Sequence, residues 1–207
     1  MDTVFNQFSK RVNRKTSDVS LFNRREISSL SKLIYPIGIV ALFLSTIEAG
    51  IKEDVETLLK NQFGEAAHLS MKKLILDRKT KSMVERKVHQ HFFKDFIYAW
   101  TITEGESIKA YCLLDNVKGL SMPITFLVIY NPLGKILTTR VIKYREPYGG
   151  EIASQNWTAQ FNGRNAESNY VVGDEIDGIS GATISVYSMA NGVRKLSVLF
   201  PLIKSQL

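Results

Sequence analysis

The stretch MPITFLVIYNPLGKILTTRVIKYR, residues 122–145, contains two runs rich in β-branched, leucine and aromatic residues. The first run, 122–131, and the second, 135–145, are separated by the turn residues Asn-Pro-Leu-Gly. Runs of this composition bounded by Asn, Pro and Gly are typical of strands, and so short a link joins antiparallel neighbours. We therefore predict a β-hairpin in this stretch.

Two further runs with the same character precede the hairpin. FIYAWTIT (96–103) and SIKAYCLLD (107–115) are linked by Glu-Gly-Glu, and Asn-Val-Lys-Gly (116–119) leads into the hairpin. Tight links between four consecutive strands predict an antiparallel meander. KKLILD (72–77) is a candidate for one more short strand.

Apolar residues at helical spacing flank the predicted sheet on both sides. Residues 52–68 and 184–205 show this stripe, residues 81–92 are assigned to a helix, and the turn-rich segment 146–165 is expected to include a short helix. The predicted fold class is therefore α+β, a mainly antiparallel sheet packed with helices. The length of 207 residues and the hydrophobic content of 44% suit one domain with a real core and some extra length.

An apolar run with a charge asymmetry around it lies ahead of this domain. LIYPIGIVALFLSTIEAGI (33–51) has Glu48 as its only charged residue, and about twenty apolar residues span a bilayer core as a helix. Residues 1–32 hold seven basic and three acidic residues, which gives +4 of the chain's net charge of +7. By the positive-inside rule we predict one N-terminal transmembrane helix, with 1–32 in the cytoplasm and 52–207 outside.

Two other interpretations of the apolar run remain open. The first is a cleaved signal peptide, although an n-region of 32 residues is long for one. The second is a buried helix of a soluble protein. A basic tail is also compatible with nucleic-acid binding. The apolar run directly after the tail favours a membrane instead, so we predict no nucleic-acid partner.

The usual catalytic motifs are absent or incomplete. His89 and His91 form a His-x-His pair without an obvious third ligand, so no metal site is predicted. Ser180 lacks the His and Asp partners of a hydrolase triad, and the glycines form neither a dinucleotide fingerprint nor a P-loop. Cys112, the single cysteine, falls in a predicted strand and is expected to be a buried, unreactive thiol. We therefore predict no catalytic residue.

The segment DGISGATIS, residues 177–185, stands directly before the last predicted helix and consists mostly of small residues. A helix N-terminus exposes unpaired N–H groups, and small residues let a phosphate approach them. Residues 180–183 are therefore a candidate phosphate site. The same residue types also form ordinary helix caps, and spacing alone leaves both interpretations open.

The pattern Asp-x-x-Ser-Gly-Ala-Thr in this segment resembles the flavinylation motif of FMN-binding domains. Such domains occur in the extracytoplasmic flavoprotein subunits of the Rnf and sodium-pumping NADH:quinone oxidoreductase (Nqr) complexes. The resemblance implies that Thr183 bears FMN through a phosphoester bond. It also implies that Asp177, Ser180, Gly181 and Ala182 complete the sequence read by a flavin transferase, which uses FAD as donor and releases AMP. A separate transferase explains the lack of a catalytic base here, since a Thr hydroxyl needs activation.

The resemblance extends upstream of the motif, over roughly residues 70–200. DNVKGLSMPITFLVIYNPLGKI (115–136) looks like the family's paired strands, and YREPYGGEI (144–152) resembles the loop that covers the flavin. In the Rnf and Nqr subunits this loop reads more like Glu-Thr-Pro-Gly-Leu-Gly, so the inserted tyrosine indicates a distinct branch. The loop supplies these candidate cofactor-binding residues: Glu146, Pro147, Gly149 and Gly150. Aromatic side chains suit a flavin ring and are equally compatible with the core; the candidates are Tyr144, Tyr148, Trp157 and Phe161.

These features predict a membrane-anchored electron-transfer flavoprotein of the bacterial cytoplasmic (inner) membrane, with a single span and an extracytoplasmic FMN domain. A carrier subunit of an oxidoreductase complex fits better than a stand-alone enzyme, because no substrate domain accompanies the motif. The expected partners are the flavin transferase during maturation, membrane lipid, and redox-complex subunits with quinone, cytochrome or iron–sulfur centres. Two alternatives remain: an extracytoplasmic flavin-dependent reductase of a small acceptor, and a flavin-free structural or assembly subunit.

Overall fold

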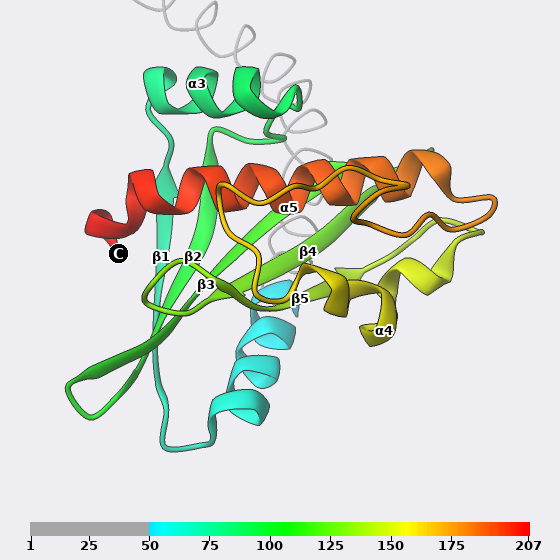
Figure 1. The fold of residues 1–207 in the computed structure, drawn as a ribbon. Helices are drawn as coiled ribbons and strands as arrows, with labels where there is room; N and C mark the ends of the chain where they lie inside the picture. The colour runs from blue at the N-terminus through cyan, green and yellow to red at the C-terminus, as the bar shows by residue number, and fades with distance from the viewer. Residues whose placement is uncertain (1–49) are drawn as a thin grey trace, which may run out of the picture. The chain divides into compact units, whose positions relative to one another are not determined.

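The computed structural model describes residues 50–207, in which five strands form one antiparallel sheet (Figure 1). The strands lie in chain order, so each pairs with its neighbour in sequence, and the predicted meander is confirmed. Their bounds are β1 His68–Ile75, β2 Phe96–Glu104, β3 Ser107–Lys118, β4 Pro123–Tyr130 and β5 Ile136–Lys143.

Two strand ends differ from the prediction by more than two residues. β3 continues to Lys118, although the sequence predicts a turn from residue 116. Val117 is buried, and Asn116 accepts a hydrogen bond of 2.7 Å from the Thr125 hydroxyl on β4, so cross-strand contacts outweigh the turn preference of asparagine. β1 begins at His68 rather than at residue 72, because it pairs with β2 along its whole length.

Helix α5 (Thr183–Ile203) lies across one face of the sheet, as Figure 1 shows, and confirms the predicted C-terminal helix. Its apolar side chains share one core with those that the strands direct to the same face. Full burial of such a side chain is worth about 1.5–3 kcal/mol, so this shared core holds α5 on the sheet. A Cβ atom at Gly192 would stand 2.5 Å from Val117, so only glycine permits this close approach of helix and strand.

Helix α3 (Arg78–Val88) packs against α5 and begins earlier than the predicted 81–92. The reason is a cap that the helical stripe does not show: the Asp77 carboxylate accepts a hydrogen bond of 3.0 Å from the Thr80 N–H. The chain leaves α3 through His89, which has a left-handed φ of 55°.

A buried ion pair ties α5 to the neighbouring elements. Lys195 Nζ lies 3.0 Å from Asp115 Oδ2 on β3 and donates a hydrogen bond of 3.0 Å to the His91 carbonyl. Burial raises the pKa of Asp115, and the attraction of Lys195 opposes this effect. Removal of either partner would leave an uncompensated buried charge, so the pair fixes α5 over β3.

The opposite face of the sheet contacts a helix that covers residues 50–63. Side chains alternate along β2, so Trp100 points away from α5, and its Nε1 donates a hydrogen bond of 3.1 Å to Glu56. The helix ends at residue 63, short of the predicted 68, because Gly64 reverses the chain with φ +92°. Two residues of this helix are fully buried: Val55 and Leu59.

The described part of the chain therefore has an α+β fold, as predicted. The predicted tail (1–32) and membrane span (33–51) lie outside the described residues, except for Gly50 and Ile51. Among residues 50–207, none of the helices combines the length and the apolar character that a membrane crossing requires. The sheet, α3 and α5 all belong to one compact unit, Asp54–Leu207.

Candidate functional site

Three segments that are distant in sequence meet at the N-terminal end of α5. They are the β3–β4 turn (119–122), the loop after β5 (144–149) and the first turn of α5. Between them lies a pocket of about 220 Å³. The residues that line it are Leu120, Glu146, Pro147, Tyr148, Gly181, Ala182, Thr183, Ile184 and Ser185. The strands and α5 share one core, so the fold itself holds the three walls together.

Thr183 is the first residue of α5, and it is exposed in this pocket. A tight turn precedes it: the Ala182 N–H donates to the Ile179 carbonyl at 3.1 Å, and Gly181 has a φ of +75° that favours glycine. Within residues 50–207 no acceptor pairs with the backbone N–H of Thr183 or Ile184. These N–H groups and the helix dipole make the pocket a favourable place for a phosphate.

Gly149 joins the loop after β5 to the start of α5. A Cβ atom at this position would lie 2.3 Å from the Ala182 Cβ and 2.9 Å from the Tyr144 hydroxyl, and the φ of Gly149 is +77°. The Tyr144 hydroxyl donates a short hydrogen bond to the Tyr148 carbonyl and so closes the loop on itself. Burial raises the pKa of Tyr144, so this hydroxyl stays protonated as a donor. Only glycine lets the loop pack this closely on Ala182.

Glu146 joins the same loop to the β3–β4 turn. Its Oε1 accepts hydrogen bonds from the backbone N–H of Ser121 at 2.8 Å and of Met122 at 2.9 Å, and its Oε2 accepts one from the Ser121 hydroxyl at 2.7 Å. The Met122 N–H, with the hydroxyl and N–H of Ser121, holds the pKa of Glu146 below its usual value. The carboxylate is therefore ionised, and both of its oxygens bind the turn.

A second layer holds the segment that leads into α5. Helix α4 (Gln155–Thr158) carries Trp157, whose Nε1 donates a hydrogen bond of 2.9 Å to the Asp177 carbonyl. Gln160, in the short helix η2 (Ala159–Phe161), accepts one of 2.7 Å from the Asp177 N–H. The Trp157 ring is buried beside Phe161 and is not among the pocket-lining side chains. Both contacts hold the backbone of Asp177 in place, and neither Trp157 nor Gln160 lines the pocket.

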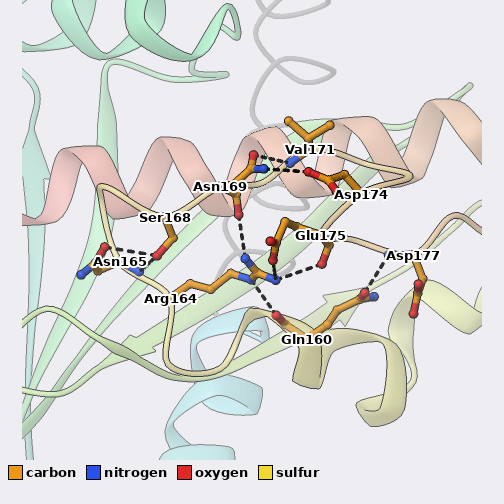
Figure 2. Close-up of polar contacts among 9 residues, drawn as sticks. All are labelled: Gln160, Arg164, Asn165, Ser168, Asn169, Val171, Asp174, Glu175 and Asp177. Carbon is orange, nitrogen blue, oxygen red and sulfur yellow. Dashed lines mark hydrogen bonds and ion pairs between the residues drawn. The ribbon is translucent and has the colours of Figure 1, made fainter.

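Arg164 organises the loop between η2 and the motif, as Figure 2 shows. Its guanidinium donates to the carbonyl of Gln160 at 2.8 Å and to that of Asn169 at 2.8 Å. It also donates to the carbonyl of Glu175 at 2.9 Å and to its carboxylate at 3.1 Å. Gln160 in turn accepts a hydrogen bond from the Asp177 N–H. The contacts of Arg164 therefore hold the segment that leads into the motif.

The structure brings six of the thirteen candidate residues from the sequence into one pocket. Those that line it are Glu146, Pro147, Tyr148, Gly181, Ala182 and Thr183. Gly149 packs against Ala182. Gly150 is the first residue of the short helix η1 (Gly150–Ala153), and no atom lies within 4 Å of the position that a Cβ atom would take there. Ser180 is exposed in the turn before α5, and Asp177 and Trp157 bind each other behind the pocket.

Several residues of the site are missed by sequence reasoning. Ile184 and Ser185, which directly follow Thr183 in the segment 177–185, also line the pocket. Leu120 lines it as well, and Gln160 and Arg164 support the motif, yet none of these three stands in a recognisable pattern. Leu120 alone gives a weak signal, as an apolar residue between the predicted turn 116–119 and the strand predicted from residue 122. The others become functional only through contacts across long loops, which no local pattern encodes.

The histidine pair and the single cysteine, for which the sequence predicts no metal-binding or catalytic role, lie outside the pocket. His91 contacts Glu85 at 3.0 Å, and residues 50–207 contain no group of three or more His, Cys, Asp or Glu side chains placed to hold a metal ion. Cys112 is buried in β3, and burial raises the pKa of its thiol far above the usual value. The predicted unreactive character of this cysteine follows from that burial.

Chemically, the pocket offers an exposed hydroxyl beside free N–H groups, with apolar and aromatic walls. No side chain of the described region hydrogen-bonds the Thr183 hydroxyl, and Glu146, the carboxylate of the pocket, is engaged by Ser121 and Met122. The site is therefore suited to hold a phosphate-bearing planar group and lacks a base to activate Thr183 by itself.

Comparison with known proteins agrees with this geometry. Residues 119–197 match the family model described as an FMN-binding domain. The match begins in the β3–β4 turn and ends within α5, so it contains every residue that lines the pocket. No curated protein matches the chain significantly.

Proposed function

Residues 119–197 belong to the FMN-binding domain family, and from this premise we propose that the chain carries FMN covalently on Thr183 and transfers electrons through it. The observation that carries the proposal is the position of Thr183. Its side chain is exposed at the first residue of a long helix, inside the pocket that all three walls of the domain form. FMN supplies the electron chemistry, and the chain supplies attachment, position and electrostatics.

The residues of the pocket fit the parts of FMN. The free N–H groups at the start of α5 and the left-handed Gly181 suit the phosphate, because both let the backbone approach an anion. Leu120, Tyr148 and Ile184 offer apolar surface for a flat ring, and Tyr148 is 76% exposed while the pocket stands open. A pocket of about 220 Å³ is smaller than most drug-sized ligand sites, which supports a covalent tether as the main source of retention.

We propose that attachment uses a flavin transferase with FAD as donor. The Thr183 oxygen forms a bond to the phosphorus of the FMN half of FAD, the pyrophosphate bond breaks, and AMP leaves. The hydroxyl proton passes to a base on the transferase, since the described residues place none at Thr183. The exposed motif, backed by Trp157 and Gln160, offers such a partner a firm surface.

Two variants of the full-length chain test the attachment, each produced together with a flavin transferase. The wild-type chain is expected to fluoresce as a flavin band on a denaturing gel. Thr183→Ala is expected to fold and to show no band, because no acceptor oxygen remains. Its free energy of unfolding should change by no more than about 0.5 kcal/mol, since the side chain is exposed and makes no cap bond.

Thr183→Ser is the matched control, since it keeps a hydroxyl at nearly the same place. We expect it to retain part of the label. A flavin band of wild-type intensity in Thr183→Ala would place the attachment on another residue. A wild-type chain that never acquires flavin would refute the covalent carrier.

We also propose that the domain is held at the outer side of a bacterial cytoplasmic membrane by residues 33–51, with 1–32 in the cytoplasm. The support is the apolar run and its basic N-terminal flank in the sequence. As a carrier subunit it would exchange electrons with membrane redox partners that hold quinone, cytochrome or iron–sulfur centres. A covalent flavin suits such a place, because a cofactor lost outside the cell is not recovered.

A further inference from the structure

The β3–β4 turn presents an apolar side chain at its tip. Leu120 is 60% exposed and lines the pocket together with Thr183 and Ile184. It belongs to none of the buried clusters of the described domain. Exposed leucine surface gains free energy when a flat apolar group covers it, and the gain depends on the turn staying in place.

The turn is built around the carboxylate of Glu146, which comes from the loop after β5. Three donors from Ser121 and Met122 converge on its two oxygens, over 24 to 25 residues of sequence. The Gly119 N–H donates to the Met122 carbonyl at 3.0 Å and closes the turn. A Cβ atom at Gly119 would lie 2.3 Å from Glu146 Oε1, so the missing side chain leaves room for the carboxylate.

We propose that Glu146 is a positioning residue that acts through Leu120. It holds the β3–β4 turn against the loop after β5, so that Leu120 forms a fixed wall for the flavin ring. The carboxylate is engaged by the turn and does not serve as a free charge beside the cofactor. This inference rests on the proposed FMN at Thr183, and it assigns the fixed orientation of the ring to a contact outside the attachment motif.

The conservative variant Glu146→Gln separates positioning from charge. The glutamine oxygen still accepts from the two backbone N–H groups, and its amide donates to the Ser121 hydroxyl, which also accepts hydrogen bonds. We call the contacts of residue 146 with Ser121 and Met122 the latch. The variant keeps the geometry of the latch and loses the negative charge. Glu146→Ala removes both. If the role is positioning, Gln resembles the wild type and Ala does not; if the role is charge, the two variants behave alike.

Leu120→Ala supplies an independent test, because it removes the wall and leaves the latch intact. Its side chain is exposed, so the variant is expected to keep the fold. If Glu146 acts through Leu120, the double variant Glu146→Ala/Leu120→Ala is no worse than Leu120→Ala alone. Such non-additivity is the signature of two residues that act as one unit. The control is Glu151→Gln, which removes a carboxylate in helix η1, directly after the same loop, that does not line the pocket.

The readout is visible circular dichroism of the bound flavin in the full-length protein, measured with its midpoint potential after labelling is verified on a denaturing gel. The wild type, Glu146→Gln and Glu151→Gln are expected to show the same flavin bands. Glu146→Ala, Leu120→Ala and the double variant are expected to lose them while the covalent label remains. A ring that is held rigidly in an asymmetric site gives these bands, and a mobile one does not.

Wild-type bands in labelled Glu146→Ala would overturn the positioning role and leave the attachment to Thr183 standing. Equal loss in Gln and Ala, with equal shifts of the midpoint potential, would overturn it in favour of a charge effect. If Glu146→Ala fails to fold, full flavin bands in Leu120→Ala would still overturn it. A wild-type chain without covalent flavin would refute the proposed function and this inference with it.

Discussion

Gly149 and Gly150 are adjacent residues with opposite tolerance for a side chain. A left-handed φ costs a non-glycine residue about 1–2 kcal/mol, and overpacking adds about 1–3 kcal/mol. Gly149→Ala meets both penalties, because its Cβ would stand 2.3 Å from that of Ala182. We expect it to displace the start of α5, to lower the melting temperature and to reduce flavin labelling.

Gly150→Ala is the matched control for Gly149→Ala, since no atom lies within 4 Å of its added Cβ and its φ is not left-handed. We expect its stability to stay within about 0.5 kcal/mol of the wild type and its labelling to be unchanged. Thermal unfolding and gel fluorescence of both variants make the comparison. Equal labelling of the two would show that the loop does not set the position of Thr183.

Glu146 also makes the β3–β4 turn sensitive to pH. Hydrogen bonds from the Met122 N–H and from Ser121 lower its pKa in the folded state from the usual value of 4.5. A carboxyl group whose pKa is lowered by folding stabilises the fold above its unfolded pKa, and this stabilisation is lost as the pH falls through the folded pKa. The latch should therefore be complete at neutral pH and open only in acid.

Ser121→Ala removes one of the donors and should move the pKa of Glu146 upward, toward the usual value of 4.5. Carboxyl titration by NMR measures the shift directly. An unchanged or lower pKa would contradict the contacts that we assign to this carboxylate.

At the scale of elements, the two tryptophans of the chain provide a natural comparison. Each donates one hydrogen bond from Nε1: Trp157 to the Asp177 carbonyl at 2.9 Å, and Trp100 to Glu56 at 3.1 Å on the far face of the sheet. Phenylalanine at either position loses that bond, worth about 1 kcal/mol, and part of the ring. Only Trp157→Phe should loosen the motif.

Hydrogen exchange of the peptides that cover residues 177–182 measures this loosening. We expect faster exchange in Trp157→Phe and wild-type exchange in Trp100→Phe, together with slower flavin labelling in the first variant alone. Equal exchange in both variants would mean that α4 does not support the motif.

The elements were more predictable than the site. The alternation of strands 96–145 and the stripe of the last helix follow from local periodicity, so the sequence predicts the meander and α5. The sequence predicts the start of α3 a few residues too late, because the apolar pattern there is ambiguous and the Asp77 cap sets the true start of the helix. β3 was predicted too short, because the pairing with β4 that extends it is not local.

The pocket could be predicted only where it coincides with a motif. Thr183 and its neighbours stand in a recognisable pattern, and the loop around Glu146 and Gly149 resembles the family's loop. Leu120 and Arg164 depend on contacts that join β3–β4, the loop after β5 and the segment before α5. Their roles arise from the fold and have no signature in the local sequence.

At the scale of the whole molecule, we propose that the domain lies outside the cytoplasm. The basic flank of residues 1–32 and the apolar run 33–51 carry this expectation. Protease added to intact spheroplasts should degrade the compact unit Asp54–Leu207 and spare the tail, while a cytoplasmic marker protein stays intact. A domain that is protected until the cells are lysed would reverse the topology.

The central claim is that FMN is bound covalently to Thr183, and peptide mass mapping of the flavin-labelled full-length chain tests it most directly. Trypsin releases residues 165–194 as one peptide, in which Thr183 is the single threonine among these other hydroxyl side chains: Ser168, Tyr170, Ser180, Ser185, Tyr187 and Ser188. We predict that this peptide gains the mass of one FMN less one water, and that fragmentation assigns the gain to Thr183. A gain on one of the serines or tyrosines, on another peptide, or on none would contradict the account.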